Sequence, residues 1–168
     1  DIFAEIIHGS RSVLAVGALA SLISVSISVL MGILSGFMGG TTDWILMRIT
    51  DIFLTIPSLP LLVVLAAFIR IGNSLIMALI LSLTSWPGLA RAIRSQTLSL
   101  REREFIEAAK VSGLNSFHIV FSELLPNMAS YIAISAIFAI TQAVYAQVGL
   151  FFLGLAPFTS INWGVMLN

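Results

Sequence analysis

The chain has 168 residues, of which 58% are apolar and only 10% carry a charge. A soluble globular domain usually has about 25% charged residues, so this composition excludes a soluble enzyme as the leading interpretation. Eight basic and eight acidic residues cancel, which leaves no net positive charge to attract nucleic acid. The sequence has no cysteine, which excludes disulfides and thiolate metal sites. Its mean hydropathy of +1.06 is that of a membrane protein.

Four uncharged stretches are long enough to cross a bilayer as helices, which takes about 20 apolar residues. They are residues 12–38, 52–69 and 71–90, and a stretch after Glu123 that we expect to end near Phe152. Strands of a membrane barrel would be about 10 residues long and would alternate apolar with polar side chains, so helices are favoured. The sequence therefore predicts an all-α, polytopic transmembrane helical bundle with about four spans.

Both ends of the chain carry apolar segments that differ from the spans. Residues 1–10 place apolar side chains near one helical face, which predicts a short helix at the outer membrane interface. Beyond Phe152 the sequence is interrupted by Pro157 and Asn162, so we expect a re-entrant or interfacial segment with Trp163 at the headgroup level. The abrupt beginning and end predict that residues 1–168 are one transmembrane domain of a longer chain.

The charges gather in one connection, residues 91–123, which holds nine of the sixteen charged residues. By the positive-inside rule this connection is cytoplasmic. Alternating the spans from there puts six basic residues inside and two outside. The sequence therefore predicts a multi-pass protein whose third and fourth spans are joined in the cytoplasm.

This cytoplasmic connection has the signals of two short helices joined by a tight turn, a shape we call the elbow. Ser99 with Glu102 fits a capping box that begins the first helix. Gly113 lies where a left-handed cap would end it. Asn115 or Ser116 can cap a second short helix, which runs through Phe117 to Leu125, and Pro126 lies where this segment would enter the fourth span.

The first helix of the elbow carries two small residues, Ala108 and Ala109, between Glu107 and Lys110. Small side chains permit close approach of another backbone, and flanking charges select the partner. The elbow is therefore suited to a groove on another protein.

The elbow also resembles the EAA signature of ABC importer permeases, the inner-membrane subunits of binding-protein-dependent uptake systems. The spacings match, although the position of the family's isoleucine holds Glu123. The residues that carry the resemblance are Glu107, Ala108, Ala109, Gly113, Leu125 and Pro126. Further stretches are similar to the dipeptide, oligopeptide and nickel group of these permeases, namely residues 36–51, 56–58, 86–91, 98–102, 152–155 and 160–166.

The resemblance implies the permease subunit of an ATP-driven importer in the prokaryotic cytoplasmic (inner) membrane, with dipeptides or oligopeptides as cargo. Its partners would be a second permease subunit in a homo- or heterodimer, two cytoplasmic ABC ATPase subunits, an external solute-binding protein and membrane lipid, without nucleic acid. ATP and Mg would be held by the ATPase, and this chain would bind no cofactor and catalyse no reaction. The family has about six spans, so we expect one span before Asp1 and one after Asn168.

The resemblance also implies which residues dock on the ATPase. The ATPase-coupling residues are expected to be Glu107, Ala108, Ala109, Lys110, Gly113, Leu125 and Pro126. Nickel and oligosaccharides are alternative cargoes in related systems. A non-transporting scaffold or a channel is the competing class of function, although a channel would show a ring of like polar residues, which this sequence lacks.

Individual residues and motifs also bear on nucleotide binding, metal binding and the shape of the spans. The sequence has no Gly-x4-Gly-Lys-Ser/Thr loop, so it cannot itself cradle nucleotide phosphates. His8 and His118 are expected on opposite sides of the membrane, and no span holds a carboxylate cluster, so no metal site is predicted. Pro57, Pro60 and Pro87 favour kinks in the second and third spans, as static bends or as hinges.

Two sets of residues in the spans are candidates for contacts. Small residues at a spacing of four make a stripe for close helix packing, either within one subunit or between subunits: Ala20, Ser24, Ser28, Gly32, Gly36 and Gly40. One face of the fourth span carries polar and aromatic residues that either border the translocation path or bond to neighbouring helices: Tyr131, Ser135, Phe138, Gln142 and Tyr145.

Overall fold

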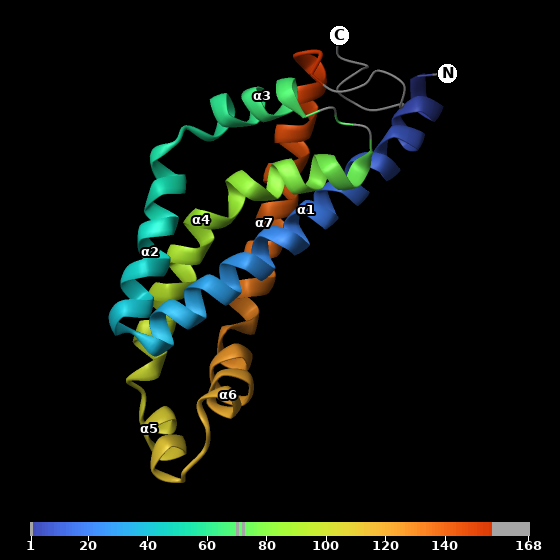
Figure 1. Cartoon of the computed structure of the whole chain (residues 1–168). Helices are drawn as coiled ribbons and strands as arrows, with labels where there is room; N and C mark the ends of the chain where they lie inside the picture. Colours follow the sequence, from blue (N-terminus) through green and yellow to red (C-terminus); the bar gives the residue numbers. More distant parts are fainter. Residues whose placement is uncertain (1, 70, 72, 156–168) are drawn as a thin grey trace. The chain divides into compact units, whose positions relative to one another are not determined.

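The computed structural model describes residues 2–69, 71 and 73–155, and all regular secondary structure in this part of the chain is helical (Figure 1). The all-α prediction is confirmed. In chain order the helices are α1 (Ile2–Met38), α2 (Gly40–Thr55), α3 (Ser58–Phe68), α4 (Ser74–Arg101), α5 (Glu104–Val111), α6 (Ser116–His118), the π-helical segment η1 (Ile119–Leu124) and α7 (Leu125–Phe152).

Three helical segments of the described chain are long and apolar enough to cross a membrane: Gly9–Met38, Ser74–Arg101 and Ser116–Phe152. The pair of α2 and α3 makes a fourth if the two helices are counted together as one bent span. These findings support a multi-pass bundle with about four spans.

The second predicted span, residues 52–69, is wrong as one continuous helix. The chain leaves the helical conformation between α2 and α3, and Pro57 is extended, with φ −60° and ψ 125°. Proline lacks the backbone N–H and disfavours helical geometry in the residue before it, so Ile56 and Pro57 separate the two helices. Pro87, in contrast, lies inside α4 without ending it.

The beginning of the first long helix also differs from the prediction. The separate helix predicted for residues 1–10 is wrong, because α1 continues through this segment into the first span. The hydroxyls of Ser10 and Ser12 donate to the carbonyls of Ile7 and Gly9, at 2.6 and 3.0 Å, so these polar side chains are satisfied within the helix. At the other end α7 stops at Phe152 as predicted, and the segment expected to hold Trp163 lies outside the described residues.

The chain divides into two compact units, and α1, α4 and α7 contribute to both. Unit 1 consists of residues 1–24, 56–85 and 136–168, and unit 2 of residues 25–55 and 86–135. The core of unit 1 joins α1, α3, α4 and α7 through apolar side chains such as Ala20, Leu62, Ala78 and Leu150. Unit 2 contains the elbow and is described below.

Within unit 1, small residues of α1 let α7 come close. A Cβ added at Gly17 would lie 3.1 Å from Cγ2 of Val144, so only glycine fits there without a shift. One turn along α1, the hydroxyl of Ser21 donates to the carbonyl oxygen of Ala136 at 2.9 Å. Hydrogen bonds of this kind add to van der Waals packing between membrane helices.

Candidate functional site

The first helix of the elbow begins later than the capping box predicts. Ser99 lies inside α4, which continues to Arg101, and α5 begins at Glu104 after the extended residue Arg103. The prediction for Ser99 and Glu102 is therefore wrong. The reason is tertiary, because Leu100 packs on the core of the elbow only when α4 is prolonged to reach it.

The turn of the elbow has the geometry of a Schellman motif, as the position of Gly113 predicts. Gly113 has φ +76°, a left-handed conformation that glycine adopts without strain. Its N–H donates to the carbonyl of Lys110 at 3.0 Å, and the N–H of Leu114 donates to that of Ala109 at 3.2 Å. These two bonds satisfy carbonyls that would otherwise be unpaired at the end of α5.

The second arm of the elbow begins at Asn115, whose Oδ1 accepts a hydrogen bond from the N–H of His118 at 2.7 Å. Of the two predicted caps, the structure therefore selects Asn115. The second arm enters α7 directly, because α6, η1 and α7 follow one another without interruption. The helix widens into the π-helical segment just before Pro126, where the missing proline N–H removes one α-type hydrogen bond.

A small apolar core holds the two arms of the elbow together. Ile106, Ala109, Ile119 and Leu124 are buried, and Phe37 from the end of α1 packs against them. Ala109 is only 6% exposed and faces this core, so it is not the surface that the sequence led us to expect. An α-helix turns by about 100° per residue, so Ala108 and Ala109 cannot both face a partner when one of them is buried.

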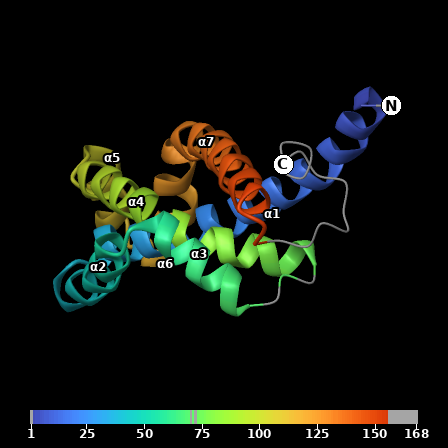
Figure 2. The same ribbon diagram turned by 90° about the horizontal axis from the view of Figure 1, so that it is seen from above.

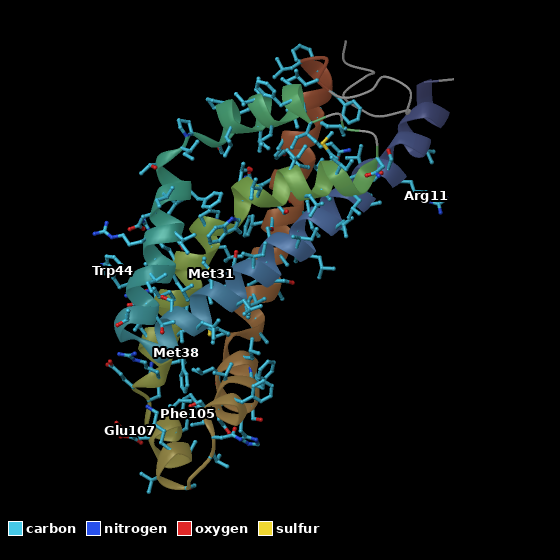
Figure 3. The ribbon with its side chains drawn as sticks, in the orientation of Figure 1. Arg11, Met31, Met38, Trp44, Phe105 and Glu107 are labelled. Atoms are coloured by element: carbon cyan, nitrogen blue, oxygen red, sulfur yellow. The ribbon has the colours of Figure 1, made fainter. Side chains whose placement is uncertain are left out.

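The outer face of the elbow is formed by exposed residues of both arms. Glu107, Ala108 and Lys110 are exposed, and Figure 3 shows Glu107 projecting away from α5. Val111 is 90% exposed and Phe117 is 71% exposed. The sequence analysis did not single out these two apolar residues. Large exposed apolar side chains beside charges are typical of a surface that binds another protein.

Phe117 also pairs with Phe121 on the second arm, with ring centroids 4.4 Å apart. The spacing of four on a helix is the signal that could have predicted this pair. At the foot of this arm Leu125 is half-buried and packs on the core that joins α1, α4 and α7 in unit 2, and Pro126 is exposed. Of the predicted coupling residues, Leu125 and Pro126 thus lie at the base of the elbow rather than on its outer face.

Next to the elbow, α1, α2 and the second half of α4 lie side by side (Figure 1, Figure 2) and are joined by polar contacts. Arg94 donates from Nε to Oδ1 and from Nη2 to Oδ2 of Asp43, each at 2.5 Å. The hydroxyl of Ser35 donates to the same carboxylate. Arg101 donates from Nη1 to the carbonyl oxygen of Gly36 at 2.9 Å. We call Ser35, Asp43, Arg94 and Arg101 the anchor.

The anchor is well suited to hold helix ends. Asp43 lies in the first turn of α2 and Arg101 beside the last turn of α1, which places each charge at the end of the helix dipole that favours it. A bidentate arginine–carboxylate pair also fixes orientation. Sequence reasoning missed the anchor, although Arg91, Arg94 and Arg101 recur at helical spacing and share one face of α4.

The stripe of small residues on α1 packs against α4 of the same chain over its middle part. Ser28 is fully buried and its hydroxyl donates to the carbonyl of Trp86 at 2.8 Å. A Cβ added at Gly32 would lie 2.7 Å from the carbonyl oxygen of Ala90, and one at Gly36 would lie 2.7 Å from Cβ of Thr97. Gly40 departs from the stripe, because it begins α2 and a Cβ there would meet nothing within 4 Å.

Ser24, the second member of the stripe, is 2% exposed, and its hydroxyl donates to the carbonyl of Ser21, about one turn earlier. This residue belongs to unit 1, while Ser28 and the two glycines that follow belong to unit 2.

The residues predicted to border the translocation path lie along a sparsely covered face of α7. Tyr131, Phe138 and Tyr145 are 37%, 66% and 69% exposed in this chain, Gln142 is exposed, and Ser135 is half-buried. Exposure alone does not distinguish these positions from Ile134 and Ile137, which are 55% and 65% exposed.

A different glutamine of α7, which the sequence analysis did not select, is the buried one. Gln147 is 2% exposed, and its Oε1 has no hydrogen-bond partner among the described residues.

No group of three or more potential metal ligands occurs in the described part of the chain. His118 is exposed on the elbow, and the side chain of His8 is outside the described side chains.

The sequence was then compared with known proteins. A profile of the family described as "Binding-protein-dependent transport system inner membrane component" matches residues 28–168. The dipeptide transport system permease protein DppC of Bacillus subtilis is 37% identical over 172 residues, which cover 100% of this chain and 52% of that protein. The oligopeptide transport system permease protein OppC of Mycobacterium bovis is 34% identical over 155 residues, which cover 92% of this chain and 53% of that protein.

The chain thus spans about half the length of these relatives. The profile covers far more than half of this chain and includes the elbow, the anchor and α7. The chain therefore belongs to the family of inner-membrane components of binding-protein-dependent transport systems.

Proposed function

We propose that this chain forms part of a permease subunit that imports dipeptides or oligopeptides across a prokaryotic inner membrane, driven by ATP. Family membership supports the permease role, and the names of the similar proteins in Bacillus subtilis and Mycobacterium bovis support a peptide as cargo. The observation that carries the mechanism is the elbow, a capped two-armed projection with charged and apolar residues on its outer face.

In this proposal the elbow docks on a separate cytoplasmic ATPase, which holds the ATP and Mg. The sequence contains no phosphate-binding loop of its own. Glu107, Ala108, Lys110 and Val111 supply the docking surface, and the Schellman turn at Gly113 keeps the two arms at a fixed angle. A complete transporter would contain a second permease subunit, two ATPase subunits and an external solute-binding protein.

The anchor connects the elbow mechanically to the membrane-spanning helices. Leu100 and Phe37 pack on the core of the elbow. Arg101, the residue after Leu100 in α4, bonds to the last turn of α1. Movement of the elbow would therefore shift α1, α2 and α4 together. Transport then follows from a change in the populations of two packings of the bundle, one open to each side.

The test is a pair of elbow variants in the assembled transporter. Glu107→Lys reverses a charge on the docking surface, and Gly113→Pro forces φ from +76° to about −65° and removes the N–H that bonds to Lys110. We expect both variants to insert in the membrane but to lose peptide uptake per ATP hydrolysed by about tenfold, the effect of about 1.4 kcal/mol at the interface. Uptake into proteoliposomes and ATP hydrolysis are measured together.

Glu102→Lys is the matched control, since it makes the same charge reversal at an exposed residue that precedes α5. It should retain coupling. Normal peptide-stimulated uptake by Glu107→Lys and Gly113→Pro would contradict the proposal, as would an equal loss in all three variants.

A cysteine scan tests the face of α7 that we propose borders the path. These 168 residues contain no cysteine, so single cysteines at Tyr131, Gln142 and Tyr145 add one labelling site each to this part of the protein. We expect a water-soluble thiol reagent to modify them faster than cysteines at Ile134 and Ile137, which are similarly exposed in the isolated chain but would face lipid or protein. Equal rates at all five positions would show that the path lies elsewhere.

A further inference from the structure

A hollow of ≈ 530 Å³ lies beside the anchor, lined mostly by residues of α2 together with Arg94 of α4. It is lined by Gly40, Asp43, Trp44, Met47, Arg48, Asp51 and Arg94. None of the permease roles described above uses this hollow.

The charges of the hollow leave one arginine available. Both acids are neutralised, because Asp43 pairs with Arg94 and Asp51 pairs with Arg91, in each case at 2.5 Å. Arg48 is exposed, and no described carboxylate lies within ion-pair distance of it. When Arg91 is included as the partner of Asp51, the two acids and the three arginines together carry one net positive charge. That charge is complementary to an anion.

Trp44 supports the guanidinium of Arg48. The Cζ atom of Arg48 lies 5.6 Å from the centroid of the Trp44 ring, within the range of a cation–π contact. Trp44 is 62% exposed, and Figure 3 shows it projecting outward from α2. Tryptophan is enriched at the headgroup level of membranes, where its ring meets both the apolar and the polar phase.

The rest of the exposed face of α2 is apolar. Ile45, Ile49 and Ile52 are 46%, 40% and 61% exposed, follow one another at spacings of four and three, and form a strip that borders Arg48 around the helix. Trp44 lies in the first turns of α2, Arg48 near its middle and Ile52 toward its end. The exposed surface of α2 therefore presents a cation beside an apolar strip, which suits the headgroup and the acyl chains of a lipid.

The beginning of α2 lies on the same side of unit 2 as the elbow, because the preceding end of α1 contributes Phe37 to the elbow core. The positive-inside rule places the elbow in the cytoplasm. The hollow thus faces the cytoplasmic leaflet, whose anionic lipids attract basic residues close to the membrane.

We propose that the hollow binds the headgroup phosphate of one anionic phospholipid of the cytoplasmic leaflet, with Arg48 as the phosphate ligand and Trp44 as its support. An arginine next to a phosphate makes two charge-assisted hydrogen bonds, which a lysine cannot reproduce. Because the lipid touches α2 next to Asp43, it stabilises the beginning of the helix that the anchor holds.

The assembled transporter in detergent is mixed with phosphatidylglycerol or phosphatidylcholine, and the lipid retained per subunit is counted by native mass spectrometry. We expect phosphatidylglycerol to be retained in preference to phosphatidylcholine. Arg48→Gln should weaken phosphatidylglycerol retention about tenfold, the loss expected for a charge-assisted hydrogen bond. Arg48→Lys should restore it only in part.

Arg11→Gln is the matched control, because it removes an exposed arginine from α1, which contributes no residue to the hollow. It should leave retention unchanged. Competition by inorganic phosphate at equal concentration should be weak, since phosphate gains nothing from the apolar strip, and strong competition would overturn the assignment to a lipid. Equal retention of the two lipids, or equal losses in Arg48→Gln and Arg11→Gln, would overturn the site.

Discussion

Replacing Gly32 with alanine is expected to destabilise the bundle although it adds a single methyl group. The new Cβ would lie 2.7 Å from the backbone oxygen of Ala90 and 2.7 Å from Cγ2 of Ile93. A backbone atom of a packed helix cannot move aside as the end of a flexible side chain can, so α1 and α4 must separate. Overpacking of this kind typically costs about 1–3 kcal/mol. The free energy of unfolding of the detergent-solubilised protein measures the effect.

The control for this variant is Gly88→Ala in α4, where an added Cβ meets nothing within 4 Å. Alanine favours helix over glycine by about 0.8–1.0 kcal/mol, so Gly88→Ala should be neutral or stabilising. The same methyl group therefore has opposite effects at two glycines of the same unit. If Gly32→Ala were as stable as Gly88→Ala, the close approach of α1 and α4 described here would be wrong.

Breaking the anchor is expected to have the second large effect. Asp43→Asn leaves Arg94 without its carboxylate, and the Arg94 side chain is only 31% exposed, so water replaces the lost partner incompletely. Hydrogen bonds to charged groups contribute about 1.5–3 kcal/mol each, and we expect a loss of about 2 kcal/mol in the free energy of unfolding. The double variant Asp43→Asn with Arg94→Gln should lose less than the sum of the two single variants.

The pair of Asp51 and Arg91 provides the comparison. Its side chains are 40% and 54% exposed, and such pairs contribute about 0.2–1 kcal/mol. Asp51→Asn should therefore change stability far less than Asp43→Asn. Additive losses in the Asp43 and Arg94 double-variant cycle, or equal losses at Asp43 and Asp51, would show that the anchor does not hold α2 to α4.

The sequence predicts the parts of this structure that depend on neighbouring residues. Gly113 and Asn115 could be recognised as caps because their chemistry acts within one helical turn. The long helices followed from the uncharged stretches, and the break between α2 and α3 required only that Pro57 be given more weight than hydropathy. These signals are local, and their outcome did not depend on how the helices pack.

The features that sequence reasoning missed depend on packing. Asp43 and Arg94 are 51 residues apart, and nothing in their spacing says that they meet. Ala109 was assigned to the docking surface because it is a small residue of the EAA signature, but its side chain is buried in the core of the elbow. Gln142 was selected by its place on a polar face, whereas Gln147, which has the buried Oε1, stands among apolar residues. Contacts between distant segments decided each of these cases.

The π-helical segment Ile119–Leu124 has a consequence for how the elbow meets the fourth span. A π-helical turn accommodates about one residue more than an α-helical turn, so side chains before it are rotated by about 100° from where an unbroken α-helix would place them. Phe117 and Tyr131 therefore do not project in the directions around the helix axis that one continuous α-helix would give them. Such an offset lets the outer face of the elbow and the surface of α7 point in independent directions, and a twist within Ile119–Leu124 would turn one relative to the other.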